Sequence, residues 1–288
     1  MFRCRSLLFA CLLVVFASAA PAKPKAPPAR AYVETSYLVA PKTVGDFALI
    51  RSKYDPAAKL AGAGFHYALA DQPALVIDVF VYPAGRLDPA KAIADGMVAF
   101  RADLAAAVSQ GAYTQLRELG DEPFALNGDA APSPQADNDA DAAVLAAIAQ
   151  SERVHGQKLR LDMHRTSTDM PLFSNGYLFY KQLYYFKVRV SAAQERIARD
   201  SFDALADQAA RALVPAIHVA NVGGCADATI HIDVNDTPEQ SAVALVRQAT
   251  THMGFNCHGS VKDAGIDGQA GTAEVIEIAY TADDWKSR

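Results

Sequence analysis

The region between Gln157 and Val190 most constrains the fold, because two long segments within it alternate apolar and polar residues. The apolar positions are Leu159, Leu161, Met163, Tyr184, Phe186, Val188 and Val190, and the polar-face positions are Arg160, Asp162, His164, Tyr185, Lys187 and Arg189. A repeat of two residues indicates a half-buried β-strand. Between the segments, Asn175 and Gly176 separate two apolar runs, which predicts a hairpin turn. The region is therefore predicted to form an antiparallel meander.

Strands and helices are predicted before and after the meander. Residues 47–54 and 63–69 are typical of strands, and the apolar, β-branched run 74–83 is typical of a central strand covered on both faces. Asp88 and Pro89 are suited to begin a helix that continues to Gly111, and a second helix is expected over residues 192–213. This order predicts an α+β sandwich domain over residues 32–220, in which helices cover a mostly antiparallel sheet.

The C-terminal residues 222–288 are predicted to form a separate small β-α-β unit. Residues 228–234 alternate as a strand does, and residues 273–280 form the closing strand. Between these strands, Thr237, Pro238 and Gln240 form the capping box of a helix that reaches Met253. A strand of seven residues and a helix of 16 residues, at about 3.3 and 1.5 Å per residue, have matching lengths of roughly 23–24 Å.

If the helix packs antiparallel to the strand, the matching lengths place Cys225, before the strand, and Cys257, after the helix, at the same end of the unit. We predict a disulfide between them that stabilises a unit with a limited core. A zinc or copper site formed by both cysteines with His252 and His258 is the chemical alternative. The adjacency of Cys257 and His258 does not match a known zinc-finger spacing, so the disulfide is the favoured interpretation and no metal or cofactor is expected.

The N-terminus predicts export. Residues 1–22 combine two arginines, a short apolar run and small residues suited to cleavage after Ala19 or Ala22, and a Pro-rich linker follows over residues 23–31. Cys11 offers an alternative lipidation site. The apolar run is too short to span a bilayer, so no membrane span is expected in the mature chain. We expect a periplasmic or secreted protein, in which Cys225 and Cys257 are the remaining cysteines.

The net charge argues against some partner classes. Loss of the two signal-peptide arginines changes the formal net charge from -5 to -7. Nucleic acids and anionic membranes select basic surfaces, so neither is an expected partner. An envelope protein or a small ligand remains as the expected partner.

The order of elements and two of the strand sequences are similar to those of a known family. Residues 40–215, with "VFVYPAG" and a later "FKVRVS" just before the second helix, resemble secreted PsbP-like α/β sandwich domains. The resemblance implies a binding or assembly factor, and it brings no catalytic motif.

Candidate functional residues come from the polar face of the meander. Tyr185, Lys187 and Arg189 are candidate surface contacts for a ligand or partner. An alternative hypothesis is an envelope hydrolase that uses a cluster of Asp78, Asp162 and His164. The acidic run 137–141 starts as a calcium loop does but lacks the glycine and glutamate that the loop requires, so we interpret it as a solvated loop. We predict a non-enzymatic binding or envelope-assembly protein, with no catalytic residue assigned.

Overall fold

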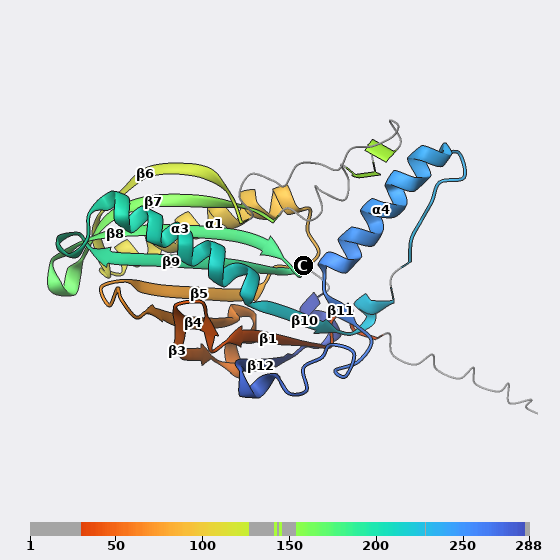
Figure 1. The fold of residues 1–288 in the computed structure, drawn as a ribbon, viewed down its shortest axis with the longest axis horizontal. Helices are drawn as coiled ribbons and strands as arrows, with labels where there is room; N and C mark the ends of the chain where they lie inside the picture. Colours follow the sequence, from red (N-terminus) through yellow and green to blue (C-terminus); the bar gives the residue numbers. More distant parts are fainter. Residues whose placement is uncertain (1–29, 127–140, 143, 146–153, 228, 286–288) are drawn as a thin grey trace, which may run out of the picture.

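The computed structural model of the chain describes residues 30–126, 141–142, 144–145, 154–227 and 229–285. The predicted signal peptide, the linker up to residue 29, and residues 137–140 of the acidic run lie outside the described residues. Two β-sheets and three labelled helices make up the described part (Figure 1).

An eight-stranded antiparallel sheet forms the centre of the fold, in the order β2-β3-β4-β5-β9-β8-β7-β6. Its strands are β2 (Thr43–Val44), β3 (Phe47–Tyr54), β4 (Ala63–Leu69), β5 (Val76–Pro83), β6 (Tyr113–Ala125), β7 (His155–Arg165), β8 (Met170–Lys181) and β9 (Tyr184–Ala193). The predicted strands at 47–54, 63–69 and 74–83 are confirmed, as is the antiparallel meander. The apolar run of β5 is central because β4 and β9 pair with its two edges.

The predicted hairpin at Asn175 and Gly176 is wrong, because β8 runs through both residues without a break. Gly176 is needed for packing: a Cβ atom there would overlap the ring of Phe100 on the neighbouring helix. Asn175 lies fully buried on the opposite face and donates a hydrogen bond to Asp203 at 2.8 Å. The local turn signal is overridden by tertiary packing on both faces of the strand.

The turn between β8 and β9 instead lies at Gln182 and Leu183, whose φ values of +55° and +69° are those of the favoured two-residue hairpin. Neither residue is a usual choice for positive φ, and neighbouring segments hold the turn in place. Gln182 Oε1 accepts a hydrogen bond from the Val219 N–H at 2.7 Å, and the Leu183 carbonyl accepts one from the Ala84 N–H at 2.9 Å. Contacts distant in sequence therefore compensate for the conformational cost.

Two helices cover opposite faces of the large sheet. Helix α1 (Pro89–Ser109) begins after the N-cap Asp88, as predicted, and packs through Met97, Phe100 and Leu104. Helix α3 (Arg199–Ala216) begins later than predicted, because β9 continues to Ala193. It buries a stripe that includes Phe202, Ala206, Ala209 and Leu213.

A second sheet packs on the same face as α3, and this corrects the prediction that helices alone cover the large sheet. Its order is β11-β10-β1-β12, with β1 (Thr35–Pro41), β10 (His218–Val222), β11 (Cys257–His258) and β12 (Ala273–Ala279). Apolar residues of both sheets and α3 form one core, which includes Leu38, Ile77, Val79, Phe186, Val188, Phe202, Val219, Ile276 and Ile278. The fold is thus a sandwich of two sheets with α1 on the outer face.

The C-terminal residues join this second sheet. Strand β12 pairs along its length with β1, so the four-stranded sheet spans both sides of the predicted boundary near residue 221. The division of the chain into two folding units stays a prediction. The predicted first strand of the β-α-β unit is wrong: residues 229–234 belong to neither sheet. These residues run beside helix α4 (Pro238–Gly254) instead.

Candidate ligand-binding site at the base of the α4 arm

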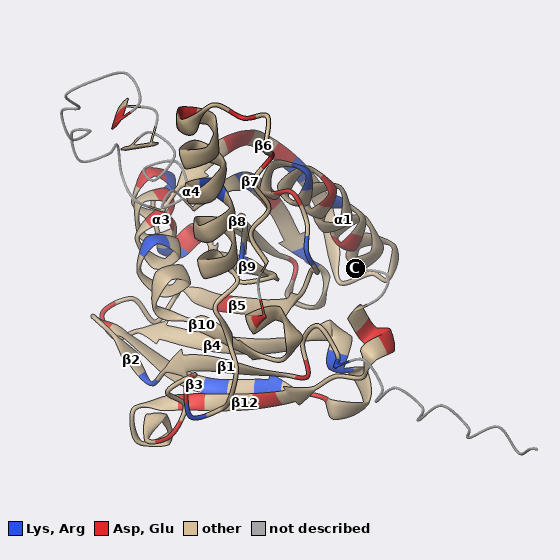
Figure 2. Ribbon diagram, turned by 90° about the vertical axis from the view of Figure 1, so that its right-hand side faces the viewer, with Lys and Arg blue, Asp and Glu red and all other residues tan. Residues whose placement is uncertain are grey.

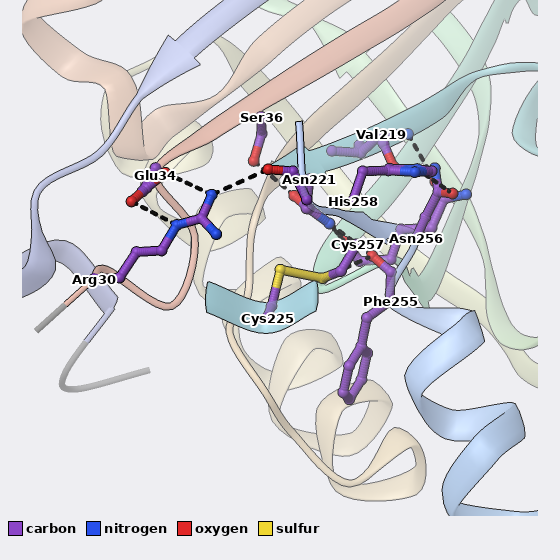
Figure 3. The surroundings of a disulfide bond; sticks show 12 residues. Arg30, Glu34, Ser36, Val219, Asn221, Cys225, Phe255, Asn256, Cys257 and His258 are labelled. Carbon is purple, nitrogen blue, oxygen red and sulfur yellow. Dashed lines mark hydrogen bonds and ion pairs between the residues drawn. A yellow bond between two sulfur atoms is a disulfide. The ribbon is translucent and has the colours of Figure 1, made fainter. Parts of the chain in front are cut away.

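A disulfide marks the start of the candidate site. Cys225, in a single 3-10 turn over Gly224–Ala226, is bonded to Cys257 in β11, with 5.8 Å between their Cα atoms (Figure 3). This is the pairing predicted from the sequence. Cys225 is buried and its N–H donates to the Tyr32 carbonyl at 2.8 Å, so the bond joins the end of β10 to the chain that follows α4.

Two asparagines fix the same junction to the second sheet (Figure 3). The side chain of Asn221, which is fully buried, accepts a hydrogen bond from Ser36 Oγ at 2.6 Å and donates one to the Phe255 carbonyl at 2.7 Å. Asn256 has a φ of +50°, and its side chain donates to the Val219 carbonyl at 2.8 Å. The junction is therefore held by hydrogen bonds as well as by the covalent bond.

Residues 229–254, which we call the α4 arm, project from this junction (Figure 1). The Thr237 capping box and Pro238 begin α4 as predicted. None of the 17 residues of α4 is buried, although an apolar face was predicted to pack on a strand. Figure 2 shows that α4 carries few charged residues compared with α1 and α3. The arm exposes large apolar side chains: Ile230, Ile232, Val234, Leu245 and Met253.

A cavity of about 570 Å³ lies where the base of the arm faces the start of α1. Its lining comes from segments that are distant in the sequence: Tyr32; Arg86, Leu87 and Asp88; Gly224, Cys225 and Asp227; the arm residues Thr229, His231, Gln248, Thr251 and His252; and Phe255, which follows α4. Cys225 is among the lining residues, so the disulfide forms part of the wall. A volume between roughly 300 and 1,000 Å³ is typical of small-molecule sites.

Several polar groups of this lining have no partner among the described residues. The Tyr32 hydroxyl and His252 Nδ1 are inaccessible to solvent and make no hydrogen bond there. The Arg86 guanidinium lies 5.6 Å from the centre of the Tyr32 ring, and no ion pair joins it to a described carboxylate. Of these groups, the exposed Arg86 guanidinium is the one that a ligand in the cavity can contact directly.

The residues of this cavity were not predicted as a site. Their signal in the sequence is proximity to the cysteines, since Phe255 lies two residues before Cys257. Tyr32 and Arg86 carry no such signal. The hydrogen bond from the Cys225 N–H to the Tyr32 carbonyl brings Tyr32 to the cavity. Arg86 reaches it because the start of α1 also lines the cavity.

The predicted surface contacts Tyr185, Lys187 and Arg189 lie beneath α1, and this corrects the expectation that they face solvent. The Tyr185 hydroxyl donates to the Ala92 carbonyl at 3.0 Å. Lys187 Nζ pairs with Asp103 of α1 at 2.9 Å, and its side chain is 17% exposed. Arg189 is half-buried and lies over the Tyr113 ring at 5.8 Å. Helix α1 covers the polar face of β9, so these side chains stabilise packing between helix and sheet.

The predicted hydrolase cluster does not form. The strand pairing places Asp78 on the face that α1 covers, whereas Asp162 and His164 lie on the opposite face of the sheet. Asp78 pairs instead with His66, with 2.9 Å between Oδ1 and Nδ1. Asp162 pairs with Arg199 of α3 at 3.1 Å. His164 faces the exposed Asp169, with 3.6 Å between Nδ1 and Oδ1.

Beside the apolar stripe of α3, a layer of paired charges joins the helix to the sheet. Asp203 receives hydrogen bonds from Asn175 and Arg199 and an ion pair from Arg160. Burial acts to raise the pKa of Asp203, but these partners outweigh burial and hold the pKa below its usual range. Lys158, 6% exposed, pairs with Asp207 at 2.7 Å. Every charge in this layer has a partner, so we interpret the layer as structural.

The metal alternative for the cysteines is overturned, because the sulfurs of Cys225 and Cys257 are bonded to each other. His252 stacks edge-on against Phe255, and His258 Nε2 lies 3.1 Å from Asn256 Oδ1. Within the described ranges, no three histidine, cysteine or carboxylate side chains gather in a way that could hold a metal ion. None of the helices in those ranges has the length and apolar character required to cross a membrane.

No family model matches the chain, and no curated protein matches it in sequence. Among solved structures, the chain is similar to the solution structure of cyanobacterial PsbP (CyanoP) from Synechocystis sp. PCC 6803. The match covers 61% of this chain and 82% of that one, with 10% sequence identity and a TM-score of 0.35.

Proposed function

We propose that the protein is a non-enzymatic ligand-binding protein of the periplasm, and that the cavity at the base of the α4 arm is its binding site. The observation that carries this proposal is the cavity itself, with the exposed Arg86 guanidinium in its lining. Between a ligand-binding and an envelope-assembly role, the cavity favours the first. The predicted signal peptide and the paired cysteines support an oxidising compartment outside the cytoplasm.

The charges of the lining indicate the class of ligand. Arg86 offers a planar guanidinium that matches a carboxylate, and Asp227 offers a carboxylate that matches an ammonium group. Tyr32, Leu87 and Phe255 provide apolar surface in the same lining. We therefore propose a small zwitterionic ligand with an apolar body, such as an amino acid or a short peptide.

The test is a binding screen with matched variants. Oxidised mature protein is screened by thermal shift against amino acids and di- and tripeptides, and each stabilising compound is then measured by calorimetry. Arg86→Gln removes the proposed carboxylate partner and is expected to weaken binding at least about tenfold, the loss typical of one charge-assisted hydrogen bond or more. Arg247→Gln on α4, whose side chain does not line the cavity, serves as the control and is expected to leave binding unchanged.

Two results would overturn the proposal. The first is that no zwitterionic compound stabilises the oxidised protein. The second is that Arg86→Gln and Arg247→Gln weaken binding equally, because a site elsewhere or a general charge effect would then account for the affinity.

A further inference from the structure

A second cavity, of about 410 Å³, lies at the end of the large sheet far from the α4 arm (Figure 1). Its lining comes from the start of β5, the end of β7, the start of β8, and the end of β9 with the turn that follows it. This volume lies toward the lower end of the roughly 300 to 1,000 Å³ typical of small-molecule sites. The cavity therefore suits a single chain or ring, and not a lipid with two chains.

The strand pairing places most of the lining side chains on one face of the sheet. The directly paired residues are Val76 with Ser191, Leu172 with Ala193, and Met170 with Arg165. Paired residues of antiparallel strands point to the same face, as do alternate residues of one strand. Leu172 is buried in the core beneath α1, so this is the face that α1 covers further along the sheet. The floor of the cavity is thus apolar, and the Arg165 guanidinium lies at its β7 edge.

Two arginines give the lining its charge. Arg165 is half-buried, and its side chain makes no ion pair or hydrogen bond to another described residue. Arg196 ends the 3-10 turn Gln194–Arg196, which Gln194 holds to the sheet by donating to a β8 carbonyl at 3.3 Å. The pair between Arg196 and Glu195, at 3.4 Å, joins two side chains that are each 69% exposed, so solvent weakens it. Both guanidinium groups are therefore available to a ligand.

The other polar groups of the lining also suit an anion. None of the described lining residues carries a carboxylate, whereas the lining of the arm cavity includes Asp88 and Asp227. Ser191 is 5% exposed, and its Oγ lies 2.9 Å from Ser174 Oγ. One of these two hydroxyls donates to the other, which leaves one hydroxyl hydrogen without an acceptor among the described residues.

We propose that this cavity binds a carboxylate that carries one apolar chain or ring, such as a medium-chain fatty acid. The planar Arg165 guanidinium matches the two oxygens of a carboxylate, and Arg196 adds a second positive charge. The chain of the ligand lies on the apolar floor beside Val76 and Leu172. A zwitterion is not favoured here, because the lining has no carboxylate to receive an ammonium group. The proposal is independent of the ligand proposed for the arm cavity.

The test compares three ligands with the same chain and different head groups. Octanoate, octanol and octylamine are each titrated into the oxidised mature protein by calorimetry. We expect a dissociation constant below about 1 mM for octanoate, an affinity within reach of a ligand of this size. Octanol and octylamine lack the charge that the guanidinium groups recognise, so we expect them to bind at least about tenfold more weakly.

Matched arginine variants locate the site. Arg165→Gln removes the proposed carboxylate partner and is expected to weaken octanoate binding at least about tenfold. Arg51→Gln makes the same change of charge at an exposed arginine of β3 that lines neither cavity. We expect its dissociation constant for octanoate to stay within about threefold of that of the unmodified protein. Thermal melting verifies that both variants are folded.

The outcomes either support the proposal or overturn it. Octanoate binding that exceeds octanol binding and depends on Arg165 supports it. The proposal is overturned if octanol binds as tightly as octanoate, or if Arg165→Gln and Arg51→Gln weaken binding equally. It is also overturned if Arg86→Gln, and not Arg165→Gln, removes octanoate binding, because octanoate would then occupy the arm cavity. Binding of zwitterionic compounds is measured separately, so failure of either proposal leaves the other standing.

Discussion

Removal of the disulfide is the perturbation whose size follows most directly from the structure. Cys225 and Cys257 are 32 residues apart in the sequence, and the bond closes that loop. For a loop of this length, the entropy lost by the unfolded chain corresponds to roughly 3 to 4 kcal/mol of stability at 25 °C. In a protein of this size, each kcal/mol shifts the melting temperature by roughly 2 to 4 °C, so the double variant Cys225→Ala/Cys257→Ala should melt roughly 6 to 16 °C lower.

The assay is thermal unfolding of the oxidised protein and the double variant, each with and without reductant. Reductant should lower the melting temperature of the unmodified protein to that of the variant and leave the variant itself unchanged. Alanine is chosen because Cys225 is buried, and a serine hydroxyl there would add a polar group without a partner. A decrease of less than about 3 °C would refute the reasoning, because the asparagine contacts at the junction would then be sufficient without the bond.

Three further predictions concern the sheet, a buried lysine and the arm. Gly176→Ala should destabilise the protein by about 1 to 3 kcal/mol in urea titrations because its Cβ overlaps the Phe100 ring, whereas Gly120→Ala, with open space around it, should change stability little. Burial lowers the pKa of Lys181 to about 7, below the value of roughly 10.4 expected in the unfolded chain, so the unfolded state binds the extra proton between these values and stability should rise with pH from about 7 to 10. Lys181→Met should reduce that slope in urea titrations across this range, and an unchanged slope would show that other groups produce it. Replacement of residues 229–253 by a short Gly-Ser linker should leave the melting temperature within a few degrees, because α4 buries no residue; a large decrease in calorimetry would contradict the description of the arm.

The sequence predicts those parts of the fold in which local pattern and burial agree. The central strand β5 and the capped helix α1 are predicted because their apolar residues follow one period and Asp88 and Pro89 mark the helix start. Strand β6 is not predicted, because it lies at the edge of the sheet and only Phe124 in it is buried. An edge strand with mostly polar residues has no apolar alternation to reveal it.

The errors at Asn175, Gly176 and residues 229–234 have a different cause. In each case the local pattern is clear, but a contact distant in sequence decides the structure. Within β8, Gly176 packs against the Phe100 ring and Asn175 donates a hydrogen bond to Asp203. For residues 229–234, the Gln248 side chain makes the hydrogen bonds to His231 that a strand partner would make. The disulfide was predicted for a strand that is not formed. The prediction still succeeded because the segment and α4 lead out from the junction and back to it.

The candidate site was the least predictable part of the molecule. Its cavity combines residues near the N-terminus, the start of α1 and the arm, and no spacing in the sequence relates these segments. Tyr185, Lys187 and Arg189 were chosen from alternation, which separates the two faces of a strand but does not show which face a helix covers. The structure places α1 over that face.

The central claim is that this chain matures in an oxidising compartment, where the bond between Cys225 and Cys257 fixes the base of the arm and a wall of the cavity. Intact-mass spectrometry of the protein expressed with its own N-terminus tests this claim most directly. The account predicts a chain that begins after Ala19 or Ala22 and that gains about 2 Da on reduction, the mass of two hydrogens. A chain that retains residues 1–22, with both cysteines open to alkylation before reduction, would contradict it.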